Sequence, residues 1–282
     1  MRPMRELLDD AQKGAYAVGA FNVYNYETIL GVVKAAQEEK VPVIVAFGER
    51  YLENMDFESV ALVAERLSRE VSTPIALHLD HCKSVEHIVQ AIRARFTSVM
   101  FDGSSLPFAQ NVAATRDVVR IAHAAGVSVE AELGAIALGD RSNEEAAEQI
   151  YTDPAQAREL VEASGVDALA VSIGTVHGLY KGEPKIGVGT LKAIRRLVSV
   201  PLVLHGGSGT PEDVLRECIR KGICKINVNT EISTLVVDRF RAMLAPGKDF
   251  HYSKLSLEAV GLVTRVARKY IGIFKGVGKR QP

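Results

Sequence analysis

The chain has 282 residues, and its 34 lysines and arginines are balanced by 34 aspartates and glutamates. This balance gives no general electrostatic attraction to nucleic acid or to a membrane surface, so we expect neither as a partner. The hydrophobic content of 47% supports a sizeable core, but no apolar run reaches the roughly 20 residues of a membrane-spanning helix. Three cysteines without CxxC spacing, and a charged start in place of a signal peptide, predict a cytoplasmic protein.

Strand-like and helix-like patterns alternate along the whole chain. Short apolar runs predict strands buried on both faces, as in a parallel sheet, and the segments between them have helical periodicity. The predicted strands are 18–23, 43–47, 75–81, 98–101, 127–133, 168–173, 201–204 and 223–228. The predicted helices are 5–13, 28–39, 57–68, 85–94, 108–125, 154–164, 189–197, 211–221, 231–244 and 255–274.

Each predicted strand is followed by a helix, which makes eight strand–helix units. This α/β pattern favours a closed (β/α)8 TIM barrel over an open doubly wound sheet. The helix before the first strand and the helix after the last unit are additions at the two ends. No shift in composition and no linker rich in Pro, Gly or Ser divides the chain, so we expect one domain over residues 1–282.

Strand 75–81 carries its polar residues, His78, Asp80 and His81, toward its C-terminal end. A buried carboxylate beside imidazoles is costly unless it is paired or bound to a metal. For this strand alone, mutual pairing of aspartate and histidine explains the pattern as well as a metal does. However, His177 and His205 also follow apolar strand-like runs. Three histidines at equivalent places on three strands predict a zinc site with an open coordination position.

A parallel barrel places its functional residues at the C-terminal ends of its strands. Asp102 and Glu132 suit a second metal, an alternative position of the first metal, or ion pairs with barrel lysines or arginines, and the sequence leaves these open. We expect His78 to pack or to orient other groups, and His87, His123 and His251 to lie on the surface. The polar residues at the predicted strand ends are Asn22, Asn25, Asp80, His81, Asp102, Glu130, Glu132, His177, His205, Ser208, Asn227, Asn229 and Thr230.

Two turns after the last two strands have the composition of phosphate-binding loops. They are Gly-Gly-Ser-Gly at 206–209 and Asn-Val-Asn-Thr at 227–230. Glycines let backbone N–H groups approach an anion, and a following helix N-terminus adds a favourable dipole. Phosphate sites recur after strands seven and eight of barrel enzymes. Lys181 either reaches the same phosphate or lies in solvent.

These segments together resemble the class II, zinc-dependent ketose-bisphosphate aldolases, which include fructose- and tagatose-bisphosphate aldolases. The resemblance covers roughly residues 5–245 and is carried by LHLDH (77–81), GTVHG (174–178), LHGGSG (204–209) and KINVNTE (225–231). It implies reversible aldol cleavage of a phosphorylated ketose (fructose-1,6-bisphosphate, tagatose-1,6-bisphosphate or a related compound) to dihydroxyacetone phosphate and an aldehyde. Zinc would polarise the ketone, and Asp80 would be the catalytic acid/base.

The resemblance also implies a role for each matching residue. His81, His177 and His205 would bind zinc, while Asp102 and Glu132 match the second metal positions. A monovalent cation, Na⁺ or K⁺, accompanies the phosphate in this family, and we expect a homodimer or a homotetramer. The residues expected to bind substrate are Asn22, Gly178, Lys181, Gly206, Gly207, Ser208, Asn227, Val228, Asn229 and Thr230.

The chain departs from the family pattern mainly where the aldehyde would bind. The loop after Gly134 lacks the usual Gly-Gly and glutamate, so assistance in proton transfer would fall to Asp140, Glu144, Glu145 or none. Residues 47–50 (Phe-Gly-Glu-Arg) replace a serine that holds substrate, and the C-terminus lacks the usual Gly-Ser ending. We therefore expect a weaker demand for a distal phosphate than glycolytic fructose-bisphosphate cleavage would impose. Only Arg50 or Arg141 would be available to hold it. The polar loop at 135–150 is expected to close over the site.

Three other interpretations remain at this point. Schiff-base aldol chemistry at Lys225 would leave the three histidines without a role. A metal-dependent hydrolase or deaminase barrel would need an HxH pair on its first strand, and it would not explain the phosphate loops. A non-catalytic or differently specific metal-dependent phosphosugar-binding barrel remains if the loop changes have removed a proton-transfer group.

Overall fold

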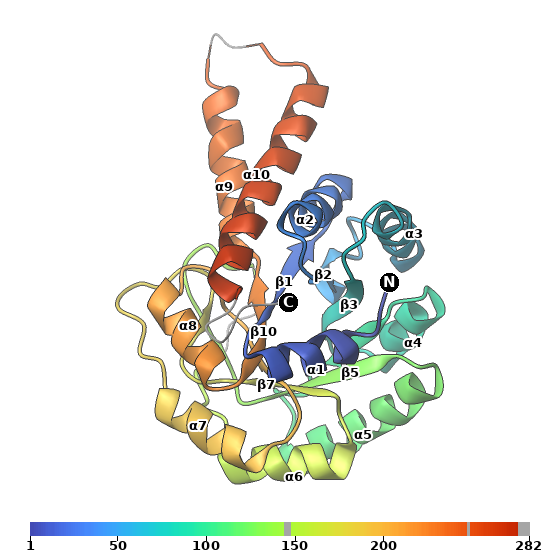
Figure 1. Cartoon of the computed structure of the whole chain (residues 1–282), viewed down its shortest axis with the longest axis vertical. Helices are drawn as coiled ribbons and strands as arrows, with labels where there is room; N and C mark the ends of the chain where they lie inside the picture. Colours follow the sequence, from blue (N-terminus) through green and yellow to red (C-terminus); the bar gives the residue numbers. More distant parts are fainter. Residues whose placement is uncertain (144–147, 247–248, 276–282) are drawn as a thin grey trace.

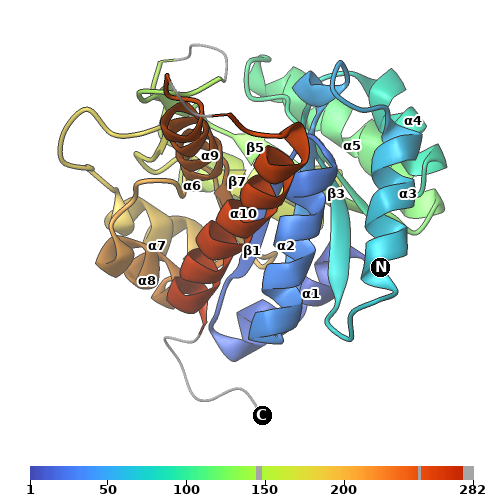
Figure 2. The same cartoon turned by 90° about the horizontal axis from the view of Figure 1, so that it is seen from above.

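Eight parallel strands close into a barrel in the computed structural model, which describes residues 1–143, 148–246 and 249–275. Their order around the barrel is β1-β10-β9-β7-β5-β4-β3-β2, with helices on the outside (Figures 1 and 2). The predicted (β/α)8 barrel is confirmed. The strands are β1 (Val18–Val23), β2 (Val43–Gly48), β3 (Ile75–Cys82), β4 (Ser98–Phe101), β5 (Ser128–Leu133), β7 (Ala168–Val171), β9 (Leu202–Leu204) and β10 (Ile223–Val228).

Local capping signals mark where several helices begin. Asn25 and Thr28 form a capping box at α2, and the side chains of Asp56, Ser84 and Asp153 accept N–H groups at the starts of α3, α4 and α6. The helices are α1 (Met4–Gly14), α2 (Tyr26–Glu39), α3 (Phe57–Ser68), α4 (Val85–Arg93), α5 (Phe108–Ala124), α6 (Pro154–Ser164), α7 (Val188–Leu197), α8 (Glu212–Arg220), α9 (Thr230–Met243) and α10 (Tyr252–Phe274).

The inside of the barrel is lined by small apolar side chains and closed at its base by α1. Ala168 and Ala170 are examples of these small side chains, and Met4 and Leu8 of α1 pack against the same cluster. Larger aliphatic and aromatic residues fill the separate layer between the strands and the outer helices. Because the interior residues are small, they leave room in the barrel for longer polar side chains. These buried polar side chains include His78, Glu130 and Lys225.

A small second sheet lies outside the barrel and was missing from the sequence prediction. β6 (Ala137–Leu138) pairs in parallel with β8 (Val176–His177). Two-residue strands carry too little periodicity to be recognised in a sequence. The strand predicted at 168–173 ends at Val171, so His177 is placed by this small sheet rather than by the end of a barrel strand.

Helices α9 and α10 form a hairpin that projects from the barrel (Figure 1). The base of α10 is fixed to α2, where Arg268 pairs with Glu38 and Glu39. Within the part of the chain that the structure describes, no helix combines the length and apolar character needed to cross a bilayer.

Candidate active site and metal centre

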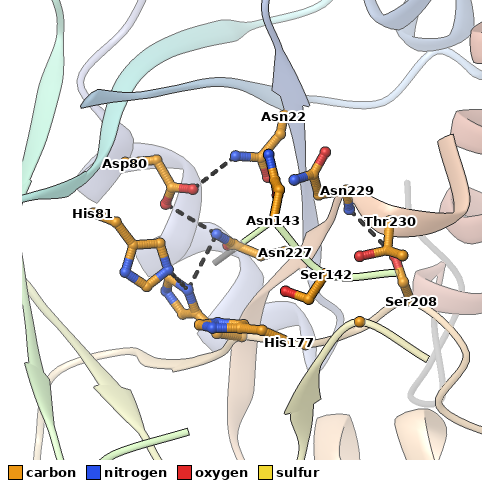
Figure 3. A pocket seen from close by; sticks show the side chains of 13 residues that line it. Asn22, Asp80, His81, Ser142, Asn143, His177, Ser208, Asn227, Asn229 and Thr230 are labelled. Atoms are coloured by element: carbon orange, nitrogen blue, oxygen red, sulfur yellow. Dashed lines mark hydrogen bonds between the residues drawn. The ribbon is translucent and has the colours of Figure 1, made fainter. Parts of the chain in front are cut away.

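The three predicted histidine ligands meet at the C-terminal mouth of the barrel (Figure 3). The ring centroids of His81 and His205 are 4.5 Å apart, and those of His81 and His177 are 5.1 Å apart. One nitrogen from each ring lies within 4.8 Å of the others. His81 holds a left-handed backbone conformation with a φ of 46°, which is uncommon for a residue other than glycine and typical of functional sites. The three rings could therefore hold one metal ion together.

The hydrogen bonds around two of these rings favour a bound cation. Glu130 Oε1 lies 2.9 Å from His205 Nε2, and Asp102 Oδ2 lies 3.0 Å from His81 Nδ1. Ionised carboxylates only accept hydrogen bonds, so these two ring nitrogens carry the protons. The other nitrogens, His205 Nδ1 and His81 Nε2, then face each other at 2.8 Å with their lone pairs. Such an arrangement is stable only with a proton or a cation nearby, and His177 supplies a third imidazole for a metal ion.

A second possible metal position uses the other nitrogen of His81. Ligand atoms of His81, Asp102 and Glu132 also lie within 4.8 Å of one another. The buried Glu132 Oε2 has no hydrogen-bond partner, and burial together with the nearby Asp102 raises the pKa of Glu132 well above its ordinary value. A cation would satisfy both carboxylates. Because neutral imidazole offers only one lone pair, the two groups suit alternative positions of one ion better than simultaneous occupation.

The alternative prediction for these acids, pairing with barrel lysines or arginines, does not hold for Asp102. In the described part of the chain its partners are His81 and Ser104. The interior lysine, Lys225, instead lies 2.8 Å from Glu130 Oε2. Glu130 therefore belongs to a layer below the mouth rather than to the strand-end group in which the sequence analysis placed it.

Asp80 lies beside the histidines and is held by two amides. Its Oδ2 accepts a hydrogen bond from Asn22 Nδ2 at 2.8 Å, and its Oδ1 accepts one from Asn227 Nδ2 at 3.0 Å. Burial alone would raise the pKa of Asp80, but the nearby His81 and Lys225 hold it below the ordinary value. An ionised carboxylate in a fixed orientation, outside both groups of possible metal ligands, is available to accept a proton.

The phosphate-type loops lie on the other side of the histidines from Asp102 and Glu132. Ser208 Oγ accepts the backbone N–H groups of Asn229 and Glu231, both at 3.2 Å, and so ties the loop after β9 to the start of α9. Thr230, the first residue of α9, lines a cavity at the mouth, so this helix N-terminus lies beside the cavity. The residues lining this cavity are Asn22, Asp80, His81, Ser142, Asn143, His177, Gly178, His205, Gly206, Ser208, Asn227, Asn229 and Thr230 (Figure 3).

Three predicted substrate-binding residues do not line this cavity. Lys181 is exposed, and its Nζ lies 3.4 Å from the exposed Asp140 carboxylate. Val228 points into the outer core, and Gly207 lies next to the lining residues without joining them. Sequence reasoning assigned whole motifs to the site, whereas alternation along a strand sends every second side chain away from it.

Glycines bring the His177 segment close to the phosphate loop. Gly206 has a φ of 73°, and a Cβ there would lie 2.3 Å from the carbonyl oxygen of Val176. Gly178 has a φ of 121°, and a Cβ there would lie 2.6 Å from the carbonyl oxygen of Asp140. Both positions need glycine for backbone packing. The glycine pattern thus serves to place His177 as well as to expose N–H groups.

Residues that the sequence analysis missed also reach the cavity. Ser142 and Asn143 of the polar loop line it. Tyr51, from the short 3₁₀ helix η1 (Glu49–Tyr51), does not line the cavity but holds two residues that do. The Tyr51 hydroxyl accepts hydrogen bonds from Asn143 Nδ2 at 3.1 Å and from Asn229 Nδ2 at 3.0 Å. Nothing in the local pattern around Tyr51 distinguishes it from a core aromatic residue.

Three acids were predicted as possible helpers in proton transfer, and the one that the structure describes does not line the cavity. Asp140 pairs through its backbone with Leu179, and its carboxylate lies beside Lys181 outside the cavity. Glu144 and Glu145 lie outside the described residues. Among the described acids, only Asp80 lines the cavity.

A larger chamber of about 650 Å³ opens on the opposite side of His81 and His177. Asp102 and Glu132 line it, together with Glu49, Arg50 and Lys83. The Glu49 carboxylate, next to the position where a serine was expected, accepts the backbone N–H of Lys83 at 3.1 Å and lies 2.6 Å from His87 Nδ1. Arg141 instead pairs with Asp238 at 3.0 Å and does not line the chamber.

One known protein family matches almost the whole chain. The family model of class II fructose-bisphosphate aldolases matches residues 2–279. The chain belongs to this family. A fructose-bisphosphate aldolase from Geobacillus stearothermophilus is 45% identical over 248 residues, which cover 86% of this chain and 85% of that relative. A fructose-bisphosphate aldolase from Staphylococcus aureus (strain Mu50) is 44% identical over 253 residues, covering 88% and 87% of the two chains.

Solved structures agree with this membership. The YdjI aldolase from Escherichia coli K12 superposes with a TM-score of 0.87 at 34% identity, covering 98% of this chain and 97% of that chain. A structure described as a putative fructose-1,6-bisphosphate aldolase from Coccidioides immitis gives a TM-score of 0.88 at 29% identity, covering 95% and 94%. The protein is therefore a class II aldolase, a lyase with a TIM-barrel fold. Membership in this class excludes the Schiff-base and hydrolase interpretations, and Lys225 does not line the cavity.

Proposed function

We propose that this class II aldolase is zinc-dependent and reversibly cleaves a phosphorylated ketose to dihydroxyacetone phosphate and an aldehyde. Its substrate would be fructose-1,6-bisphosphate, tagatose-1,6-bisphosphate or a related ketose phosphate. The single observation that carries the proposal is the position of Asp80. Its fixed carboxylate lies between a three-histidine cluster and a phosphate-type cavity that it lines together with all three histidines.

The proposed ligands of the catalytic zinc ion are His81, His177 and His205. Asp102 and Glu132 would hold a second position with the other nitrogen of His81. Burial lowers the pKa of His177 well below its ordinary value, with the nearby His81 and His205 contributing, so this ring stays neutral and can donate a lone pair. When bound, zinc supplies Lewis-acid polarisation of the substrate ketone.

Asp80 would move the proton at the C4 hydroxyl. In the cleavage direction it accepts that proton as the C3–C4 bond breaks, and in the condensation direction it returns it. Asn22 and Asn227 hold both carboxylate oxygens, so the base does not have to be ordered when the substrate arrives. A positioned acid/base of this kind contributes typically ~10²–10⁴-fold to the rate.

The loops after β9 and β10 would hold the phosphate of the ketone half. Gly206, Ser208, Asn229 and Thr230 all line the cavity, and Thr230 is the first residue of α9. A monovalent cation, Na⁺ or K⁺, would share this phosphate site. With Ser142 and Asn143 in place the cavity measures about 30 Å³, too little for a sugar phosphate. We propose that these two loop residues move when substrate binds, as the expected closing loop would.

The remaining features of the proposal concern the assembly and its location. We propose one catalytic domain that forms a homodimer or a homotetramer in the cytoplasm. Apolar side chains at the far end of the α9–α10 hairpin support association, because Leu244, Tyr252 and Leu257 are 54%, 77% and 70% exposed. The three cysteines are free and buried, as a reducing compartment allows.

A panel of ketose phosphates assayed with and without added zinc tests the proposed function. We expect C–C cleavage with release of dihydroxyacetone phosphate, and we expect loss of activity in chelator that zinc restores. The main alternative is a phosphosugar-binding barrel without catalysis. It would show tight ligand binding by calorimetry and no cleavage of any member of the panel.

A further inference from the structure

The barrel interior contains a charge pair that the proposed reaction does not use. Lys225 Nζ lies 2.8 Å from Glu130 Oε2, and both side chains are completely buried. Removing two charges from water costs several kcal/mol per ion, and buried pairs can often be replaced by apolar side chains without loss of stability. Neighbouring interior positions such as Ala168 and Ala170 are apolar, and His78 Nε2 lies 3.7 Å from Glu130 Oε2. Folding alone therefore gives no reason for charges at this depth.

The second oxygen of Glu130 connects this pair to the metal centre. Glu130 Oε1 lies 2.9 Å from His205 Nε2. The other oxygen of Glu130 receives the Lys225 ammonium group. A carboxylate in such an ion pair acts only as a hydrogen-bond acceptor, so His205 carries its ring proton on Nε2. The lone pair then sits on His205 Nδ1, the nitrogen that lies 2.8 Å from His81 Nε2 in the cluster.

We propose that Lys225 and Glu130 are positioning residues that fix His205 in the tautomer and orientation in which Nδ1 binds the metal. This inference rests on the metal site proposed above and gives neither residue a part in bond cleavage. Lys225 acts through Glu130, because it holds Oε2 of that carboxylate and so leaves Oε1 directed at His205 Nε2. Changing a carboxylate that orients a histidine ligand typically weakens metal affinity ~10–100-fold.

Two double variants distinguish the effect of the hydrogen bond between Glu130 and His205 from the effect of burying the Lys225–Glu130 ion pair. K225M/E130M and K225M/E130Q both remove the ion pair, so neither leaves an unpaired buried charge. Glutamine keeps an acceptor oxygen for His205 Nε2, whereas methionine has a similar length and no such acceptor. Zinc affinity of the full chain is measured by competition with a chromophoric chelator, and the His205 tautomer is measured by ¹⁵N NMR. K192M, at an exposed lysine of α7, is the control and should match wild type.

We expect zinc to bind ~10–100-fold more weakly to K225M/E130M than to wild type, with a mixed His205 tautomer, and K225M/E130Q to remain closer to wild type. Equal zinc affinity in the two folded double variants, or an unchanged tautomer in K225M/E130M, overturns the inference while the aldolase proposal stands. Failure of wild type to bind zinc through His205 contradicts both. If thermal unfolding shows that K225M/E130M does not fold, K225M/E130Q is compared with K225M/E130L by the same criteria.

Discussion

The two sides of the metal centre are built in different ways. The phosphate side lies over β9, β10 and the start of α9, where Ser208 and Tyr51 hold Asn229 through hydrogen bonds. The opposite side, over β2 to β5, is a chamber of about 650 Å³ lined largely by loop residues such as Arg50 and Leu106. The first side matches the family motifs closely, and the second contains most of the departures. Residues on barrel strands and helix ends are fixed by the fold, whereas loop residues change freely and set specificity.

The largest effect is expected at the junction of the two sides. His205→Ala removes one of three proposed ligands and leaves Glu130 without its histidine partner, so zinc and cleavage should both be lost. Elemental analysis measures zinc per chain, and His251→Ala, at an exposed position, is the control. Full zinc occupancy in His205→Ala would mean that the histidine cluster is not the metal site.

Asp80→Ala should abolish most of the cleavage and leave binding intact. The expected loss in kcat is ~10²–10⁴-fold, because the proton-transfer group is gone while the ligands and the phosphate loops remain. Zinc content and dihydroxyacetone phosphate affinity are measured beside kcat. Asp140→Ala is the matched control, since its carboxylate lies outside the cavity. Loss of zinc together with activity in Asp80→Ala would make Asp80 a metal ligand instead.

The sequence was sufficient to predict the barrel, because apolar runs are a local signal and located all eight barrel strands. Asp80 and the three histidines were predicted to lie together and do line one cavity, while their roles stay predictions. Tyr51 and Asn143 were missed because their role depends on contacts between segments far apart in the chain. The role of Lys225 was likewise hidden, since its partner Glu130 is on another strand.

The phosphate side should respond to a single hydrogen-bonding residue. Ser208→Ala leaves two backbone N–H groups at the start of α9 without their acceptor. A hydrogen bond of this kind contributes about 0.5–1.5 kcal/mol to the stability of the loop, so its loss should raise KM by at most roughly 10-fold. Steady-state kinetics should show this rise with little change in kcat. Lys181→Ala is expected to change KM less than Ser208→Ala, and the reverse order would place Lys181 on the phosphate.

The smallest effect is expected on the chamber side. Arg50 lines the chamber and Arg141 does not, so only Arg50→Ala should alter the preference among aldehydes. We expect a change of a few-fold in kcat/KM for condensation with a phosphorylated aldehyde, because an exposed charge contact contributes about 1 kcal/mol or less. Arg141→Ala should leave this preference unchanged. Equal shifts in both variants would point to a general effect of surface charge.

The contrast between a complete phosphate side and an altered chamber side is tested most directly by one ratio. It is kcat/KM for fructose- and tagatose-1,6-bisphosphate over kcat/KM for the corresponding 1-phosphates, measured with zinc-loaded enzyme. A site with few donors for a distal phosphate gains little from it, whereas a site built for it discriminates strongly. We predict cleavage of both kinds of substrate and a modest preference for the bisphosphates. A preference of several orders of magnitude for both bisphosphates would contradict the account, since it would require a strong distal-phosphate site.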